Sequence, residues 1–144
     1  MNLDTIFSYW GEDSKVDRSN LGEAALDISS LHHKYHKIYT NERLVLRSYE
    51  SKLKTLKLQK YEFYTQGPTQ ETVDLGWKLP PSGKILKQEV ANYMEADPEI
   101  IELGLKIGLQ HEKVELLESI IKTITNRGFQ IKTALDYMKF TMGE

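Results

Sequence analysis

The feature that most constrains this chain of 144 residues is a stretch, residues 23–66, without a glycine or a proline. These two residues are the strongest helix breakers, so their absence predicts one long helix from Leu21 to Tyr64. A helix of this length is about 66 Å long. Asn20 and Glu23, three residues apart at its start, predict a capping box.

Charge is concentrated in the second half of this helix. Residues 34–60 contain eight lysines or arginines and two acidic residues, whereas the segments before and after them are both net acidic. At about 100° per residue, four cations and one aromatic residue fall on one narrow stripe of the helix. The stripe consists of Arg43, Arg47, Lys54, Lys57 and Tyr61. A single basic segment indicates a localised anion site and not a uniformly basic coat.

The stripe runs into a group of aromatic residues, and this combination is typical of a track for single-stranded DNA. Cations follow the phosphates, and aromatic rings stack on unpaired bases. The candidate DNA-binding residues are Arg43, Arg47, Lys54, Lys57, Lys60, Tyr61, Phe63 and Tyr64. The alternative is a solvated polar face with the aromatic residues in the core, and the spacing alone leaves both interpretations open.

Residues 66–96 form a connector between two helical parts. Glycines and prolines between residues 65 and 83 exclude a long helix there. Residues 72–75 and 76–79 are expected to form short strands, and residues 84–93 a short helix. The connector therefore predicts a short irregular or β segment in a chain that is otherwise mainly α.

A second long helix is expected from Asp97, with Asp97 as the cap and Pro98 at the first helical position. It is expected to end at Asn126 with Gly128 as the stop, followed by a short helix over residues 129–140. Its apolar residues follow an unbroken heptad in which Gln110 occupies one seam position. The apolar seam consists of Ile100, Leu103, Ile107, Val114, Leu117, Ile121 and Ile124. The seam fits either an intramolecular core or subunit contacts, and we favour subunit contacts.

Several classes of function lack their sequence signatures. The absence of cysteine excludes disulfides and thiolate zinc sites and fits a reducing cytoplasm. His32 and His36 have ligand spacing, but no third ligand completes a metal site. There is no phosphate loop or nucleophile elbow, so we expect a non-enzymatic protein without cofactor or metal. The sequence has no apolar run that could span a membrane and no signal-peptide pattern.

Two motifs in the sequence are specific enough to compare with known families. The first is the run from Arg127 through Gly128, Phe129, Gln130 and Ile131 to Lys132, followed by Asp136 and Phe140. The second is the basic and aromatic stretch over residues 56–65. Together with the entry from Val16 to Leu21, these motifs resemble a known family, the UvsY-type recombination mediators of T-even-like bacteriophages. Gln66 before the Gly67 turn and Leu58 at a position that is basic in the family depart from the pattern. By position, Lys60 matches the second basic residue of the family, and Phe63 and Tyr64 match its aromatic pair.

The resemblance implies a single recombination-mediator domain over residues 1–144 that assembles into a helical ring, a hexamer or heptamer. It implies DNA binding by residues 20–65, a connector at 66–96 and oligomerisation by residues 97–144. Such a protein binds single-stranded DNA, helps displace the phage single-strand-binding protein and loads a RecA-like recombinase of the UvsX type. It would act in the cytoplasm of the infected bacterial host.

Two other functions fit parts of the same sequence. A coiled-coil scaffold without a nucleic-acid role would share the heptad but would not need the basic stripe. A regulator of double-stranded DNA would need two short helices around a tight turn, and the unbroken helix argues against it. Salt-sensitive binding to single strands distinguishes the mediator from both.

Overall fold

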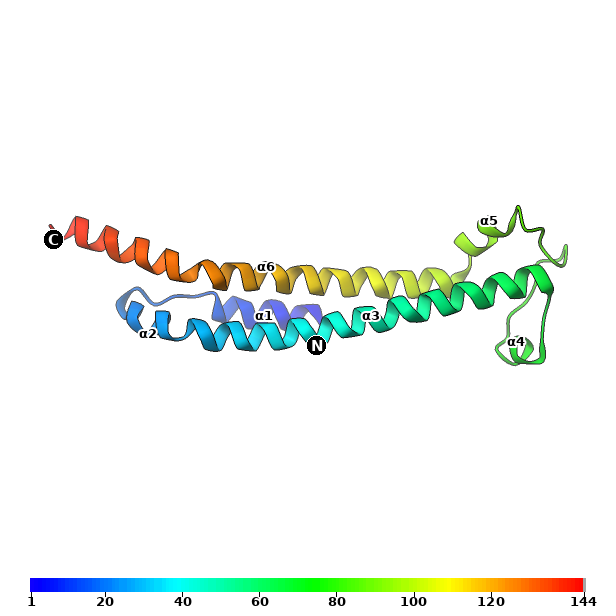
Figure 1. Ribbon diagram of the computed structural model, residues 1–144, viewed down its shortest axis with the longest axis horizontal. Coiled ribbons are helices and arrows are strands. Elements are labelled where there is room, and N and C mark those ends of the chain that lie inside the picture. Colours follow the sequence, from blue (N-terminus) through cyan, green and yellow to red (C-terminus); the bar gives the residue numbers. More distant parts are fainter. Residues whose placement is uncertain (144) are drawn as a thin grey trace. The chain divides into compact units, whose positions relative to one another are not determined.

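Seven helical elements follow one another along residues 1–143, the part of the chain that the computed structural model describes (Figure 1). They are α1 (Leu3–Asp13), η1 (Arg18–Asn20), α2 (Leu21–Leu26), α3 (Ile28–Gln66), α4 (Gln70–Asp74), α5 (Val90–Glu95) and α6 (Pro98–Thr141). These residues contain no strand, so the mainly α fold is confirmed. Residues 1–45 with 110–144 form one compact unit, and Leu46–Leu109 form a second.

The first long helix begins later than the sequence predicts. α2 ends at Leu26, and α3 begins at Ile28 after Asp27. The capping box does not form, because the Asn20 side chain makes no capping hydrogen bond. A short 3-10 helix, η1, leads directly into α2, and Asp17 caps it by accepting from the Ser19 backbone amide at 2.9 Å. The capping role at this end of the helix therefore belongs to Asp17.

The prediction of two short strands in the connector is wrong. Residues Gln70–Asp74 form the short helix α4, which starts at a reciprocal capping box between Thr69 and Thr72. The side-chain hydroxyls of both threonines satisfy backbone amides at the start of this helix, which favours the helix locally over a strand. The helix expected at residues 84–93 is also displaced, since α5 spans Val90–Glu95.

The second long helix begins where predicted but does not stop at Gly128. The Asp97 carboxylate accepts hydrogen bonds from the backbone amides of Glu99 and Ile100, at 3.0 and 3.1 Å, which confirms Asp97 as the cap. α6 then continues through Gly128 to Thr141. Arg127 and Ile131, on either side of this glycine, are both buried. Their packing holds the helix together where a glycine would otherwise permit it to end.

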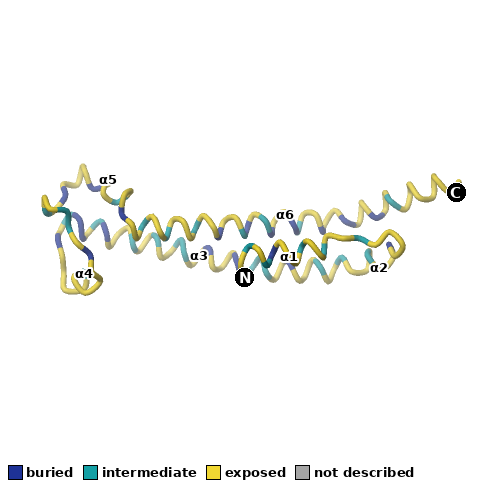
Figure 2. The backbone as a smooth tube through the Cα atoms, turned by 180° about the vertical axis from the view of Figure 1, so that it is seen from behind, coloured by how far each residue is buried: buried dark blue, intermediate teal, exposed yellow. Residues whose placement is uncertain are grey.

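The core of the first unit brings together α1, α3 and α6. Its fully buried residues are Ile6 of α1, Tyr35 of α3, and Leu117, Ile120 and Ile124 of α6. Trp10 packs edge-on against Tyr35 with ring centroids 5.6 Å apart. α1 therefore docks on the core of its own chain (Figure 2).

The heptad seam of α6 is largely occupied within the chain. Leu117 and Ile124 belong to the core of the first unit, and Val114 is also buried. Ile121 of the same unit and Ile100, Leu103 and Ile107 of the second unit are half-buried. Within one chain, α1 and α3 pack against this part of the seam, so Val114, Leu117 and Ile124 are covered without a second subunit. Subunit contacts through the seam stay a prediction.

Gln110, the polar member of the heptad, has a defined role in the first unit. Its side-chain amide donates to the Glu42 carboxylate at 2.6 Å and to the Glu42 carbonyl at 2.7 Å. Both side chains are buried. A buried polar pair of this kind fixes the register of two helices, here α3 and α6.

Candidate nucleic-acid interface

Three of the predicted cations lie exposed on α3 within the second unit. They are Arg47, Lys54 and Lys57, and none has an ion pair or hydrogen bond with another side chain of residues 1–143. Helical geometry places them within an arc of about 80°. Along the helix axis, Arg47 lies about 10.5 Å before Lys54, and Lys54 lies about 4.5 Å before Lys57. Unpaired cations with this spacing are available to bind a chain of phosphates.

Arg43 belongs to the first unit and is also exposed. Its guanidinium lies over the ring of Tyr39, 5.2 Å from the centroid, and donates a long hydrogen bond of 3.5 Å to the Tyr39 hydroxyl. Tyr39 in turn donates to the Glu118 carboxylate at 2.9 Å. These contacts orient the guanidinium and leave it without a carboxylate of its own.

Lys60 has a different environment from the rest of the predicted set. It is only 4% exposed, and its ammonium contacts Asp97 at 3.1 Å and Glu99 at 3.4 Å. The ammonium also lies 3.9 Å from the centroid of the Trp77 ring. Lys60 therefore ties the end of α3 to the start of α6 within the second unit, and it does not present a free charge to DNA.

The aromatic residues of the predicted track are also mostly in the core. Phe63 and Tyr64 are buried in a cluster with Trp77, Ile85 and Val90. Phe63 meets Trp77 edge-on at 5.5 Å. Their rings are enclosed by the connector, so they are not exposed for stacking on bases. Tyr61, in contrast, is half-buried and lies at the end of the exposed stripe.

Asp97 is the centre of a buried polar network in this unit. Its carboxylate accepts from the Tyr64 hydroxyl at 2.6 Å, from Lys60 and from two backbone amides. Burial by itself raises the pKa of Asp97, but the bonds from Tyr64, the Ile100 amide and Lys60 outweigh it and hold the pKa below its usual value. Burial, and then the bond to Asp97, raises the pKa of Tyr64. The network is thus ionised at Asp97 and neutral at Tyr64 at pH 7.

Lys52 is a further cation of α3 that lies outside the predicted stripe. Lys52 is exposed on α3, and its ammonium lies 5.8 Å from the centroid of the Tyr49 ring. It lines an open, mainly polar hollow whose other residues are Ser48, Ser51, Thr55, Leu56 and Gln59. The pairing of an aromatic residue and a cation three positions apart is the sequence signal for this contact.

Two further observations concern other kinds of site. The rings of His32 and His36 stack with centroids 5.7 Å apart, but no group of three potential ligands in residues 1–143 is arranged for a metal ion. No helix in this part of the chain is long and apolar enough to cross a membrane.

Comparison with known proteins identifies a family for this chain. A family model described as "Recombination, repair and ssDNA binding protein UvsY" matches residues 9–144. Among curated proteins, none matches the sequence.

Solved structures show the same fold. Two crystal structures of the bacteriophage T4 recombination mediator protein UvsY have TM-scores of 0.80, with 16% and 18% sequence identity. The matches cover 98% and 99% of this chain, and 99% and 98% of theirs. A third crystal form has a TM-score of 0.78 and 16% identity, with 95% of this chain and 98% of the other covered. Because the family model spans almost the whole sequence and the fold agrees with it, this chain belongs to the UvsY family.

Proposed function

We propose that this protein is a non-catalytic recombination mediator that binds single-stranded DNA through the exposed cations of α3. The observation that carries the proposal is the row formed by Arg47, Lys54 and Lys57, which are exposed and unpaired within the part of the chain that the structure describes. The family description, which includes recombination, repair and single-stranded DNA binding, supports the same role. Tyr61 extends the proposed contact at its end within the second unit, and Arg43 of the first unit is a further exposed cation.

The physical basis of binding is the release of counterions from the DNA backbone. Four cations per subunit, counting Arg43, would give a slope of log K against log salt of about −3 for a single strand. The half-buried ring of Tyr61 would add stacking on one base, about 1–3 kcal/mol. The affinity of one subunit for single-stranded DNA is therefore expected to be modest and to depend strongly on salt concentration.

Assembly into a homo-oligomer, a hexamer or heptamer, would combine several of these weak DNA-binding sites in one particle. Repeating the stripe around a ring raises the affinity by multivalency without any new contact. With much of the heptad seam buried, we place the subunit contact on the exposed apolar face of α6 in the second unit, formed by Ile101, Leu105 and Leu109. A Cβ atom added at Gly104 or Gly108, on the same side, would meet no atom within 4 Å, so another backbone has room to approach.

The bound DNA strand would then be transferred to a recombinase. A ring of cations competes with a single-strand-binding protein for the same phosphates. The strand released in this way would be held extended for a RecA-like recombinase of the UvsX type. No step in this sequence requires bond making or breaking by the mediator itself.

The test is fluorescence anisotropy of a labelled single-stranded oligonucleotide at several salt concentrations, repeated with duplex. We expect Arg47→Ala with Lys54→Ala and Lys57→Ala to weaken single-strand binding and to reduce the salt slope by about 2. The matched control removes three exposed lysines of α6, with Lys106→Ala, Lys122→Ala and Lys132→Ala.

Equal losses in the two triple variants would show that total charge, and not the α3 stripe, determines binding. No binding by the unaltered protein at low salt would leave the coiled-coil scaffold as the better function. Displacement of a single-strand-binding protein and stimulation of a recombinase are the assays that follow if the strand binds.

A further inference from the structure

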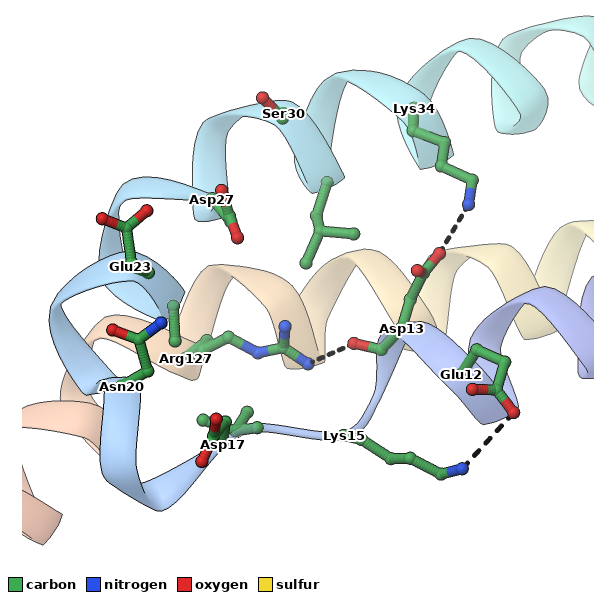
Figure 3. Close-up of a pocket in the computed structure, with 13 residues that line it drawn as sticks. Glu12, Asp13, Lys15, Asp17, Asn20, Glu23, Asp27, Ser30, Lys34 and Arg127 are labelled. Carbon is green, nitrogen blue, oxygen red and sulfur yellow. Dashed lines mark hydrogen bonds and ion pairs between the residues drawn. The ribbon is translucent and has the colours of Figure 1, made fainter.

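The first unit contains a cavity of about 430 Å³ that DNA binding by α3 does not use (Figure 3). The end of α1, the segment before α2, α2 itself and the start of α3 form its walls. Arg127 reaches it from α6. Its volume lies in the range of sites that enclose small ligands or a few side chains.

Arg127 is the unusual residue of this cavity because its charge is buried without an ion pair. Its guanidinium carbon lies 5.6 Å from the centroid of the Trp10 ring, and its charge helps to lower the pKa of the Asp13 carboxyl. It is 4% exposed, and the ion pairs within residues 1–143 do not include it. Its Nη2 donates to the backbone carbonyls of Asp13 at 3.0 Å and Ser14 at 3.4 Å. Its Nε is buried and has no hydrogen-bond partner in the described chain. A guanidinium in this state lacks an acceptor, which a ligand oxygen would supply.

The carboxylates around the cavity divide into two groups. Glu12 and Asp13 are already paired, with Lys15 at 3.3 Å and Lys34 at 2.6 Å. The others, Asp17, Glu23 and Asp27, have no cation partner within residues 1–143 and are exposed (Figure 3).

The arrangement of these acids limits what they can bind. No group of three acidic or histidine side chains in the described residues is arranged for a metal ion. The acids are therefore spread around the rim, where a larger cationic group, and not a bare ion, would meet them. A nucleic acid is disfavoured because its phosphates would be repelled by the unpaired carboxylates.

We propose that this cavity binds an extended lysine- or arginine-bearing segment of a partner protein. A backbone carbonyl of the segment would accept a hydrogen bond from the Arg127 guanidinium, while its basic side chain lies against Glu23 and Asp27. A peptide satisfies both requirements at once because it carries neutral acceptors and separate cations on one chain. The acidic cavity then recruits a protein, whereas the basic stripe binds DNA.

The test uses a fluorescein-labelled peptide, acetyl-Gly-Lys-Gly-Arg-Gly-amide, with its Glu/Asp counterpart as the acidic probe. Anisotropy is measured with the full chain at low salt. We expect the basic probe to bind and the acidic probe not to bind. The double variant Glu23→Gln with Asp27→Asn is expected to weaken the affinity for the basic probe about fivefold or more. Asp17 is left unchanged because it caps η1. The matched control is Glu112→Gln with Glu115→Gln, two exposed acids of α6 outside the cavity.

A second variant tests whether the buried guanidinium of Arg127 contributes to peptide binding. Arg127→Lys keeps the charge but loses the planar set of donors, so it is expected to weaken the basic probe while circular dichroism shows a folded chain. Should this variant fail to fold, the Glu23 and Asp27 pair still decides the outcome. Single-stranded DNA binding by the Glu23 and Asp27 variant is expected to be unchanged, which separates this proposal from the proposed function.

Four results would overturn the proposal. They are no binding of the basic probe, equal binding of the acidic probe, and equal weakening by the control pair of acids. The fourth is a changed sedimentation profile of the Glu23 and Asp27 variant, which would assign the cavity to a second copy of this chain.

Discussion

At the scale of single residues, Lys57 and Lys60 show how the environment decides what a lysine does. Both belong to the basic stretch of α3, three residues apart, but Lys57 is exposed and Lys60 is enclosed by Asp97, Glu99 and Trp77. With Arg43 as zero, Lys60 falls near 260° on the helix. The apolar residues of this helix fall between about 200° and 300°, and they are Leu46, Tyr49, Leu53, Leu56 and Phe63. The angle is thus a signal in the sequence for burial. The acidic partners come from α6, and no local pattern identifies them.

Separate substitutions of these two lysines are expected to give opposite results. Lys60→Ala leaves Asp97 buried without its cation and should lower the free energy of unfolding by about 3 kcal/mol. Lys57→Ala should change stability by less than about 0.5 kcal/mol but weaken single-strand binding. Denaturant unfolding and anisotropy, measured on both variants, check this. A stable Lys60→Ala protein with impaired DNA binding would return Lys60 to the DNA interface.

The buried Asp97 also makes a prediction about pH. Its pKa is lowered in the folded chain, so its stabilising effect is present above the unfolded pKa of about 3.9 and is lost as the pH falls through the folded pKa. Asp97→Asn should therefore be less stable than the unaltered protein at pH 7, and the difference should shrink below about pH 4. Urea unfolding of both proteins between pH 7 and pH 2 measures it. A difference that does not change with pH would contradict the ionised network.

At the scale of elements, the strong local signals predicted helix type well and helix ends less well. The Asp97 cap and the body of both long helices were predictable because propensity and capping act over a few residues. Gly128 was misjudged because it is a good C-cap only where no packing continues on its far side. Residues 70–74 were misjudged because the hydroxyls of Thr69 and Thr72 form a helix cap.

Replacing Gly128 tests the continuity of α6. Gly128 has an ordinary helical backbone, and a Cβ atom added there would meet nothing within 4 Å. Gly128→Ala should therefore raise the free energy of unfolding by about 0.5–1 kcal/mol. Gly67→Ala is the control and should be destabilising, because Gly67 has a φ of +96° and a new Cβ would lie 3.1 Å from Lys84. Destabilisation by Gly128→Ala would indicate that the helix ends at this glycine.

At the level of the whole chain, the proposed oligomer requires apolar residues that the chain's own helices leave exposed. The chain's own helices cover Val114, Leu117 and Ile124. Ile101, Leu105 and Leu109 remain 45%, 71% and 53% exposed. Residues four apart on a helix share a face, so these three form one uncovered apolar stripe. Exposed stripes of this kind are typical of protein interfaces.

Charges on this stripe are expected to break the proposed oligomer without unfolding the single chain. Leu105→Glu with Leu109→Glu should lower the sedimentation coefficient, while circular dichroism remains helical, since a charge is costly only where a partner buries it. The control is Leu75→Glu with Leu86→Glu, two leucines of the same unit with similar exposure, 57% and 60%. An unchanged sedimentation profile in the first variant would place the subunit contact elsewhere.

The helical class, the basic stretch of α3 and the family can be predicted from the amino-acid sequence, because these depend on local propensity, local charge and short motifs. Which members of each pattern are exposed depends on how the helices pack. Lys60, Phe63 and Tyr64 belong to the same basic and aromatic stretch as Lys57, yet they are buried. Leu117 belongs to the same heptad seam as Leu103, but Leu117 is fully buried and Leu103 is only half-buried. Burial depends on partners far away in the chain, such as Asp97 for Lys60 and α1 for Leu117. A periodic pattern in the sequence predicts which residues share one face of a helix, but it does not predict which other segments pack on that face.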